Sequence, residues 1–142
     1  HDTKLDEQNV SINFFDGQQI SFSLISEPLD TLLGVADFIS IHVPAQKNYI
    51  IGAAEFDKMK QGVAIVNAAR GGTLDEVALV DAIKSGKVSF AGLDVFESEP
   101  QPEISILMHP NISLSPHIGA ATLEAQDRIG VELASQLKEL LG

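Results

Sequence analysis

Apolar and polar residues alternate along two early segments of the chain. In residues 10–14 and again in residues 20–24 every second side chain is apolar, and Asp16-Gly17 between them is a two-residue turn signal. An alternation of period two places all the apolar side chains on one face of a strand. The pattern therefore predicts a half-exposed β-hairpin.

Beyond Asp37 the apolar residues become nearly continuous in short runs. Residues 38–43 and 63–67 contain few polar side chains, as parallel strands that are covered on both faces require. Two later runs, residues 90–94 and 112–115, are predicted to be further short strands.

Between these runs the apolar spacing changes to that of helices. Residues 53–60 carry two apolar side chains three apart and end before Gly62, which predicts a short crossover helix. Residues 73–76 have the form of a capping box, and Gly86 can close the helix that follows. In the last segment, residues 122–141, apolar side chains at helical spacing predict a long amphipathic helix.

Strands that alternate with helices predict an α/β fold with right-handed crossovers. Sheets of this kind bind ligands beyond the carboxyl ends of their strands. The residues that follow the predicted strands are polar or include glycine: His42, Val43 and Pro44; residues 67–72; Asp94; and residues 116–120. We therefore expect a functional site among them.

Composition and charge narrow the classes of function. The 142 residues, of which 44% are apolar and 20% charged, match one globular domain. A formal net charge of −11 repels phosphate backbones and anionic membranes, so nucleic-acid and membrane partners are not expected. No apolar run approaches the length of a membrane span and no basic segment followed by an apolar stretch opens the chain, so we expect a cytoplasmic protein. The start at His1-Asp2, without methionine, suggests a processed product or a piece of a longer protein.

Metal and thiol chemistry have little support in the sequence. There is no cysteine, which excludes disulfides, thiolate ligands and thiol nucleophiles. The four histidines are His1, His42, His109 and His117, and no two have the spacing that would bring them onto one helical face. No metal site is expected.

The candidates for chemistry each have a plain structural explanation when taken alone. Arg70 follows an apolar strand and precedes two glycines, where a planar guanidinium suits a carboxylate, but a surface salt bridge explains it equally well. His117 can be a hydrogen-bonded loop histidine, and Glu97 and Glu99 can be solvated loop carboxylates. No single residue decides between these interpretations.

The order of the motifs along the chain is more specific. The segments NAARGG, GLDVFESEP and SPHIGAAT, at residues 67–72, 92–100 and 115–122, closely resemble the signature series of the D-2-hydroxyacid dehydrogenases. HVP at residues 42–44 resembles a further element of that family, and the resemblance covers about residues 29–141. It implies a Rossmann-like, doubly wound parallel sheet, here partial, with an inserted β-hairpin and a long C-terminal helix.

The resemblance also implies roles for individual residues. Arg70 would bind the substrate carboxylate and polarise the reacting oxygen, while His117 would accept the hydroxyl proton as a hydride leaves for NAD. Glu99 would hold His117, because a nearby carboxylate stabilises the imidazolium. Asp94 would hydrogen-bond the nicotinamide carboxamide, although an aspartate that caps a turn is the structural alternative. The residues that would contact NAD are Asp2, His42, Val43, Pro44, Ala68, Ala69, Arg70, Asp94, His117, Ile118, Gly119 and Ala120.

One part of the family pattern is missing from these residues. No GxGxxG occurs, although that loop would hold the pyrophosphate of the cofactor. Asp2 falls where the family has an acidic residue for the adenosine ribose, which would favour NAD over NADP. We therefore expect residues 1–142 to be the later part of an NAD-binding domain, without the first βαβ unit and the substrate domain, and to be inactive alone.

The function that the resemblance implies is hydride transfer between a small D-2-hydroxyacid and NAD, in an enzyme that is a homo-oligomer at full length. Within the family resemblance, the sequence of residues 50–103 and 121–133 favours 3-phospho-D-glycerate, the substrate at the entry to serine synthesis. Other acids, of the glycerate, glyoxylate or lactate type, are alternatives. A non-catalytic, NAD-sensing corepressor-like scaffold and an inactive partial sheet also stay open. A serine hydrolase based on Ser115 and His117 has little support, since the chain has no GxSxG elbow.

Overall fold

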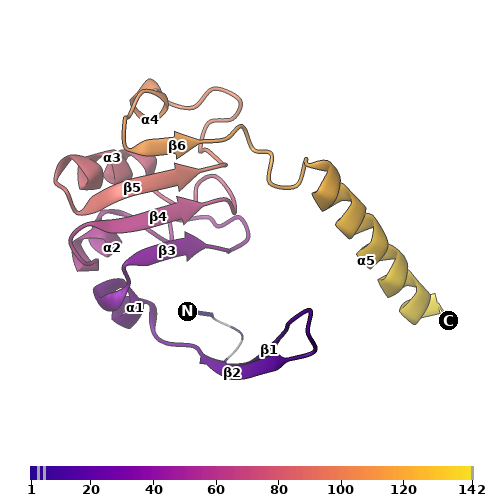
Figure 1. The fold of residues 1–142 in the computed structure, drawn as a ribbon. Helices are drawn as coiled ribbons and strands as arrows, with labels where there is room; N and C mark the ends of the chain where they lie inside the picture. Colours follow the sequence, from indigo (N-terminus) through magenta and orange to yellow (C-terminus); the bar gives the residue numbers. More distant parts are fainter. Residues whose placement is uncertain (3, 5, 142) are drawn as a thin grey trace.

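The chain forms a parallel sheet with helices and a separate hairpin (Figure 1), as seen in a computed structural model that describes residues 1–2, 4 and 6–141. The strands are β1 (Glu7–Asn13), β2 (Gln19–Ile25), β3 (Phe38–Ile41), β4 (Val63–Asn67), β5 (Val88–Leu93) and β6 (Ile112–Leu114). The helices are α1 (Leu29–Val35), α2 (Ala53–Lys58), α3 (Glu76–Lys84), α4 (Ile104–Leu107) and α5 (Leu123–Leu141). β1 pairs with β2 antiparallel, while β3, β4, β5 and β6 pair in that order and all parallel. The predicted α/β fold with its parallel sheet, hairpin and long last helix is confirmed.

The hydrophobic core lies between the parallel sheet and the helices on one of its faces. Ile65 and Ala91 in the two central strands are fully buried, and they belong to one cluster with Phe56 of α2 and Leu79 of α3. Within the described chain the other face of the sheet is open, so the strands are not covered on both faces as their apolar runs predict. The exposed apolar side chains of that face are Phe38, Val66 and Phe90.

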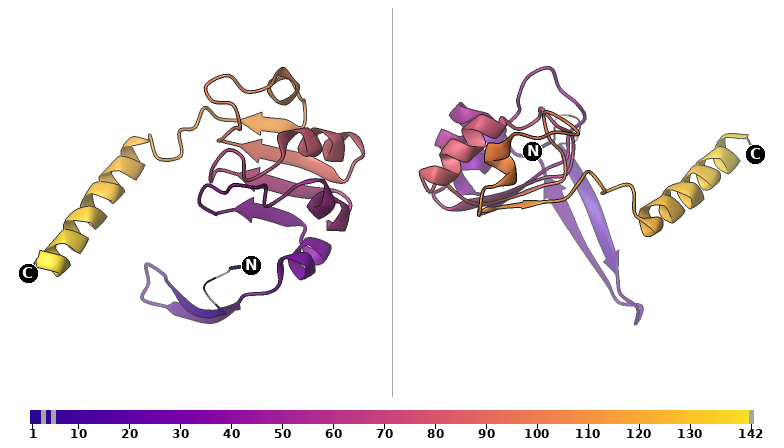
Figure 2. Two further views of the ribbon diagram at one scale, coloured as in Figure 1. Left: turned by 180° about the vertical axis from the view of Figure 1, so that it is seen from behind. Right: turned by 90° about the horizontal axis from the view of Figure 1, so that it is seen from above.

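Two elements extend away from this core (Figure 2). Among the apolar side chains of α5 that recur at helical spacing, Ala125 is buried, whereas Ile129, Leu133, Leu137 and Leu140 are exposed. On the hairpin, Ile12 faces Ile20 across the two strands, and both are about half exposed. The hairpin is therefore exposed on both faces, rather than on one face as the alternation predicts. Of the helices that the described residues form, none has the length and apolarity to cross a membrane.

Local hydrogen bonds correct two predicted turns. The N–H of Phe14 donates to the carbonyl of Gln18 at 2.8 Å, so the hairpin loop has three residues rather than two, with Gly17 at a φ of 84°. The helix α3 is capped by Asp75, whose side chain accepts from the N–H of Ala78 at 2.9 Å. The expected cap by Thr73 is wrong, because its hydroxyl is used in the preceding loop.

The short helices α1 and α4 were not predicted. Neither has a side chain that caps its N-terminus, and α4 is a single turn of four residues. The N-cap of α1 is Pro28 and that of α4 is Glu103, and each accepts a helix N–H through its backbone carbonyl but not through its side chain. Helices this short depend on tertiary packing rather than on local signals, and each is fixed by one buried residue, Leu33 and Ile106 respectively.

The core predicts a sharp contrast between two residues of α3. Leu79 is fully buried, whereas Val77 is 73% exposed. Leu79→Ala should lower the free energy of unfolding by about 2–5 kcal/mol, because it removes buried methyl groups and leaves a cavity. Val77→Ala, on the same helix, should change it by no more than about 0.5 kcal/mol. Denaturant unfolding of both variants would measure the difference, and equal effects would contradict this description of the core.

Candidate active site

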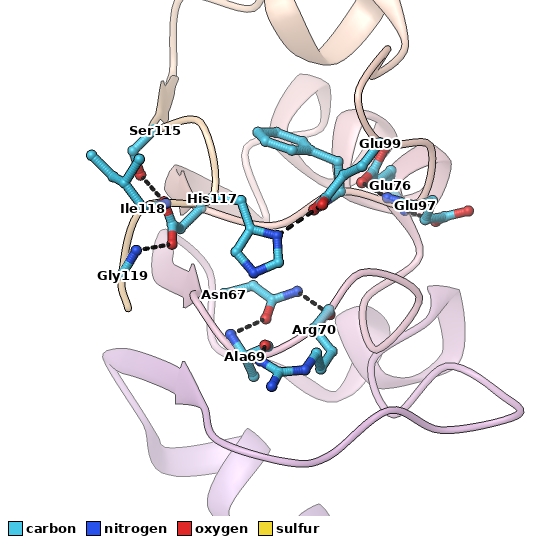
Figure 3. Close-up of polar contacts among 12 residues, drawn as sticks. Asn67, Ala69, Arg70, Glu76, Glu97, Glu99, Ser115, His117, Ile118 and Gly119 are labelled. Carbon is cyan, nitrogen blue, oxygen red and sulfur yellow. Dashed lines mark hydrogen bonds and ion pairs between the residues drawn. The ribbon is translucent and has the colours of Figure 1, made fainter. Parts of the chain in front are cut away.

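The carboxyl ends of β4, β5 and β6 meet at one edge of the sheet. Leu93 pairs with Asn67 on one side and with Leu114 on the other. Two hydrogen bonds continue this ladder past the strand ends, from the N–H of Asp94 to the carbonyl of Asn67 and from the N–H of Ser115 to the carbonyl of Leu93, both at 3.0 Å. The loops that follow the three strands therefore start side by side, and their polar residues converge (Figure 3).

The carboxylate of Asp94 holds the turn that contains His117. Its Oδ1 accepts from the hydroxyl of Ser115 at 2.6 Å and from the N–H of Ile118 at 2.9 Å, and its Oδ2 accepts from the N–H of Gly119 at 2.9 Å. Burial acts to raise the pKa of the Asp94 carboxyl, but these hydrogen bonds outweigh it and hold the pKa below its ordinary value. His117 itself has a φ of 54°, a conformation that side chains rarely adopt without such support. Asp94 therefore caps this turn, which is the structural role that the sequence analysis left open for it.

The ring of His117 is held by Glu99. The Nδ1 of His117 lies 2.8 Å from Oε2 of Glu99, and Oε1 of Glu99 accepts from the N–H of Phe96 at 2.9 Å. The hydrogen bond from His117, followed by that from Phe96, lowers the pKa of the Glu99 carboxyl, so Glu99 is ionised at neutral pH. An ionised carboxylate only accepts hydrogen bonds, so Nδ1 carries a proton. In neutral His117 the Nε2 atom is then a proton acceptor, and no described residue hydrogen-bonds to it.

Buried polar residues shape the loop that carries Arg70. Asn67 is buried, and its amide donates to the carbonyl of Arg70 at 3.3 Å and to the hydroxyl of Thr73 at 3.1 Å. That hydroxyl donates in turn to the carbonyl of Arg70 at 2.7 Å. The loop also lies very close to the next one, because a Cβ on Gly71 would meet the carbonyl oxygen of Phe96 at 1.9 Å. Only glycine permits this approach, which brings the backbone next to Arg70 against the loop that leads to Glu99.

A pair of glutamates, Glu97 and Glu76, ties the loop of Glu99 to α3. Oε1 of Glu97 accepts from the N–H of Glu76 at 3.0 Å, and Oε1 of Glu76 accepts from the N–H of Glu97 at 2.7 Å. The hydroxyl of Tyr49 donates to Oε2 of Glu97 at 3.0 Å. Burial, partly offset by the hydrogen bond from Glu97, raises the pKa of the Glu76 carboxyl. Glu97 is thus not a purely solvated carboxylate, and no spacing signal in the sequence indicated Tyr49 or Glu76 as its partners.

A cavity of about 740 Å³ brings the predicted catalytic residues together. Its lining includes Lys47, Tyr49, Arg70, Glu97, Glu99 and His117. A second cavity of about 390 Å³ is lined by others of the predicted residues, Asp2, His42 and Val43, and the ring of His42 contacts the hydroxyl of Ser40 at 2.8 Å. The remaining predicted residues line neither of these cavities; they are Pro44, Ala68, Ala69, Asp94, Ile118, Gly119 and Ala120.

The residues at the sheet edge fit the nicotinamide end of NAD. A carboxylate oxygen accepts two hydrogen bonds, and Oδ2 of Asp94 has only the N–H of Gly119 as a partner among the described residues. A carboxamide N–H can therefore still be accepted there. Ala68, Ala69 and Ala120, in the loops after the neighbouring strands, carry only a methyl side chain. Among the described residues no group of three or more histidine, aspartate or glutamate side chains could hold a metal ion.

Comparison with known proteins gives a family match over most of the chain. The family described as D-isomer specific 2-hydroxyacid dehydrogenase, NAD binding domain, matches residues 13–119. The chain is similar to a D-3-phosphoglycerate dehydrogenase of Archaeoglobus fulgidus, with 48% identity over 123 residues that cover 84% of this chain and 23% of that protein. It is also similar to a hydroxypyruvate reductase of Thermotoga maritima, with 50% identity over 119 residues, 80% of this chain and 39% of the relative. The chain thus spans only part of the length of each relative.

Solved structures resemble the fold as well as the sequence. The crystal structure of a glyoxylate reductase from Paecilomyes thermophila matches with a TM-score of 0.69 and 45% sequence identity. The match covers 78% of this chain and 34% of that one.

The buried carboxyl of Glu76 predicts a change of stability with pH. A carboxyl whose pKa is higher in the folded than in the unfolded state favours folding when protonated, and loses that contribution as pH rises through the folded pKa. Glu76→Gln should therefore gain stability relative to the unaltered chain as pH rises from below the ordinary value of 4.5 to neutral. Urea unfolding across this range would measure the gain, and Glu139→Gln on the exposed α5 is the control. A difference that does not change with pH would show that burial of this charge is not costly.

Proposed function

Since this chain belongs to the D-isomer specific 2-hydroxyacid dehydrogenase family, we propose that it serves hydride transfer between a D-2-hydroxyacid, 3-phospho-D-glycerate, and NAD. The observation that carries the proposal is the contact of 2.8 Å between Glu99 and Nδ1 of His117, beside a cavity that Arg70 also lines. An acid–base group and a fixed cation in one cavity are what oxidation of a 2-hydroxyacid requires.

Arg70 is proposed to bind the carboxylate of the substrate. Among the described residues, the hydrogen bond that its guanidinium makes is from Nη1 to the carbonyl of Ala69, at 2.5 Å. The remaining N–H groups of the planar guanidinium can donate to two carboxylate oxygens, and such paired bonds fix the orientation of the acid as well as its position. The same positive charge lowers the energy of an alkoxide that forms on the neighbouring carbon.

His117 is proposed to be the acid–base catalyst. Its Nε2 takes the hydroxyl proton during oxidation and returns it during reduction, while Nδ1 stays bonded to Glu99. The ionised carboxylate of Glu99 stabilises the imidazolium that forms, because opposite charges at hydrogen-bond distance favour the charged ring. When bound, NAD supplies the nicotinamide carbon that accepts the hydride, and the Oδ2 atom of Asp94 would orient its carboxamide.

The choice of substrate rests on the relatives. The D-3-phosphoglycerate dehydrogenase of Archaeoglobus fulgidus supports 3-phospho-D-glycerate, and with it a place at the entry to serine synthesis. The hydroxypyruvate reductase of Thermotoga maritima supports a second candidate, the interconversion of hydroxypyruvate and D-glycerate. Both reactions use the same hydride and proton transfers, and they differ only in whether the acid carries a phosphate.

We propose further that residues 1–142 are the later part of the NAD-binding domain of a cytoplasmic, homo-oligomeric enzyme. The absence of GxGxxG from these residues supports this division, because the pyrophosphate then needs another segment. The exposed apolar side chains of the hairpin and α5 also favour burial against further protein.

Two substitutions test the proposed chemistry in the full-length protein that contains this chain. His117→Gln should lower kcat by about 10²–10⁴-fold, because the proton acceptor is lost. Arg70→Ala should raise KM for the acid and lower kcat as well. The measurement is NADH formation, followed by its absorbance at about 340 nm, with 3-phospho-D-glycerate and with D-glycerate as substrates.

The control for these variants is His109→Gln. His109 precedes β6 at the amino end of the sheet, and among the described residues its ring accepts the N–H of Asn111 at 3.2 Å, so the rate should stay close to that of the unaltered protein. Full activity in both His117→Gln and Arg70→Ala would contradict the proposed mechanism. An unaltered protein that oxidises none of the 2-hydroxyacids would contradict the function itself.

A further inference from the structure

The loop between β3 and α2 forms one wall of the cavity and is anchored near its end. The hydroxyl of Tyr49 donates to Glu97 at 3.0 Å, and both residues line the cavity. The N–H groups of Ile50 and Ile51 both donate to the carbonyl of Thr73, at 2.8 and 3.2 Å. Lys47 lies two residues before the first of these anchors, and it lines the same cavity as Arg70. The loop is thus fixed in a way that keeps Lys47 at the cavity.

Lys47 differs from the other lysines near the sheet in having no partner among the described residues. Lys58, Lys60 and Lys84 each form a salt bridge with an aspartate. Lys87 donates to the backbone carbonyl of Met59 at 2.9 Å. In a chain with a formal net charge of −11, a lysine that lines a cavity and has no such contact stands out.

The carboxylates of the cavity do not neutralise Lys47. Glu97 accepts from Tyr49 and from the N–H of Glu76, and Glu99 accepts from Phe96 and contacts His117. Each of these carboxylates is therefore already held by other donors. The cavity consequently offers two cations, Arg70 and Lys47, that no carboxylate of the described chain pairs with.

We propose that Lys47 binds a phosphate group at the far end of the substrate from the carboxylate that Arg70 binds. This rests on the proposed function and makes the preferred substrate a 2-hydroxyacid that carries a phosphate monoester. Such a group has a charge between about −1.5 and −2 at neutral pH, and lysine binds it as a point charge with three donors. A volume of about 740 Å³ is enough for both ends of a small phosphorylated acid.

The test compares phosphorylated and unphosphorylated acids in the full-length protein that contains this chain. Lys47→Gln should lower kcat/KM for 3-phospho-D-glycerate by about tenfold, mainly through KM, because one partly exposed ionic contact is lost. It should leave kcat/KM for D-glycerate and KM for NAD nearly unchanged. Lys47→Arg should restore most of the preference, since it keeps the charge. Lys84→Gln, an exposed lysine of α3 outside the cavity, controls for the change in net charge.

Each contrary outcome has its own meaning. An equal loss with both acids would overturn the proposal, because Lys47 would then not distinguish the phosphate. A rise in KM for NAD alone would overturn it too, and would assign Lys47 to the cofactor phosphates. An effect of the same size in Lys84→Gln would overturn it as well, because the loss would then come from the change in net charge and not from Lys47. An unaltered protein that oxidises D-glycerate but gains nothing from the phosphate would refute the role of Lys47 while leaving the proposed hydride transfer intact, whereas inactivity with both acids would refute the hydride transfer.

Discussion

The carboxylate of Asp94 is the contact on which the geometry of the site depends. Its hydrogen bonds with Ser115, Ile118 and Gly119 hold a turn in which His117 has a φ of 54°. A side chain with that backbone conformation costs energy unless its surroundings fix it. Asp94 can fix it because it follows the central strand β5 and is itself buried. The position of the His117 ring, and hence its contact with Glu99, follows from this arrangement.

The other loops are fixed to this one by close backbone contact rather than by further ion pairs. Gly71 lies against the carbonyl of Phe96 at a distance that no Cβ would permit, which sets the backbone next to Arg70 against the loop that leads to Glu99. The reciprocal bonds between Glu76 and Glu97 then tie that loop to the first turn of α3. Because α3 packs into the core, the exposed residues of the site are supported by a buried element, as a preorganised site requires.

The strands and the helices α2, α3 and α5 could be predicted because their signals are local: apolar runs, helical spacing and a closing Gly86 at a φ of 75°. The grouping of Arg70, Glu99 and His117 could be predicted from motif order, since parallel strand ends share one edge. The helices α1 and α4 could not, because tertiary contacts rather than local signals fix them. Tyr49 and Glu76 lie 48 and 21 residues from Glu97, and no periodicity connects residues so far apart.

The carboxylates near His117 differ in pKa in a way that suits proton transfer. Hydrogen bonds lower the pKa of Glu99 and of Asp94, so both stay ionised where an imidazolium would form. Burial instead raises the pKa of Glu76, which is hydrogen-bonded to Glu97 in the loop of Glu99. The carboxyl with the raised pKa, Glu76, therefore supports the loop of Glu99, whereas the two with lowered pKa, Asp94 and Glu99, lie beside His117. In the proposed mechanism the carboxylate of Glu99 can act on the ring of His117 only while it keeps its place 2.8 Å from Nδ1, so the rigidity of its loop is part of the proposed chemistry.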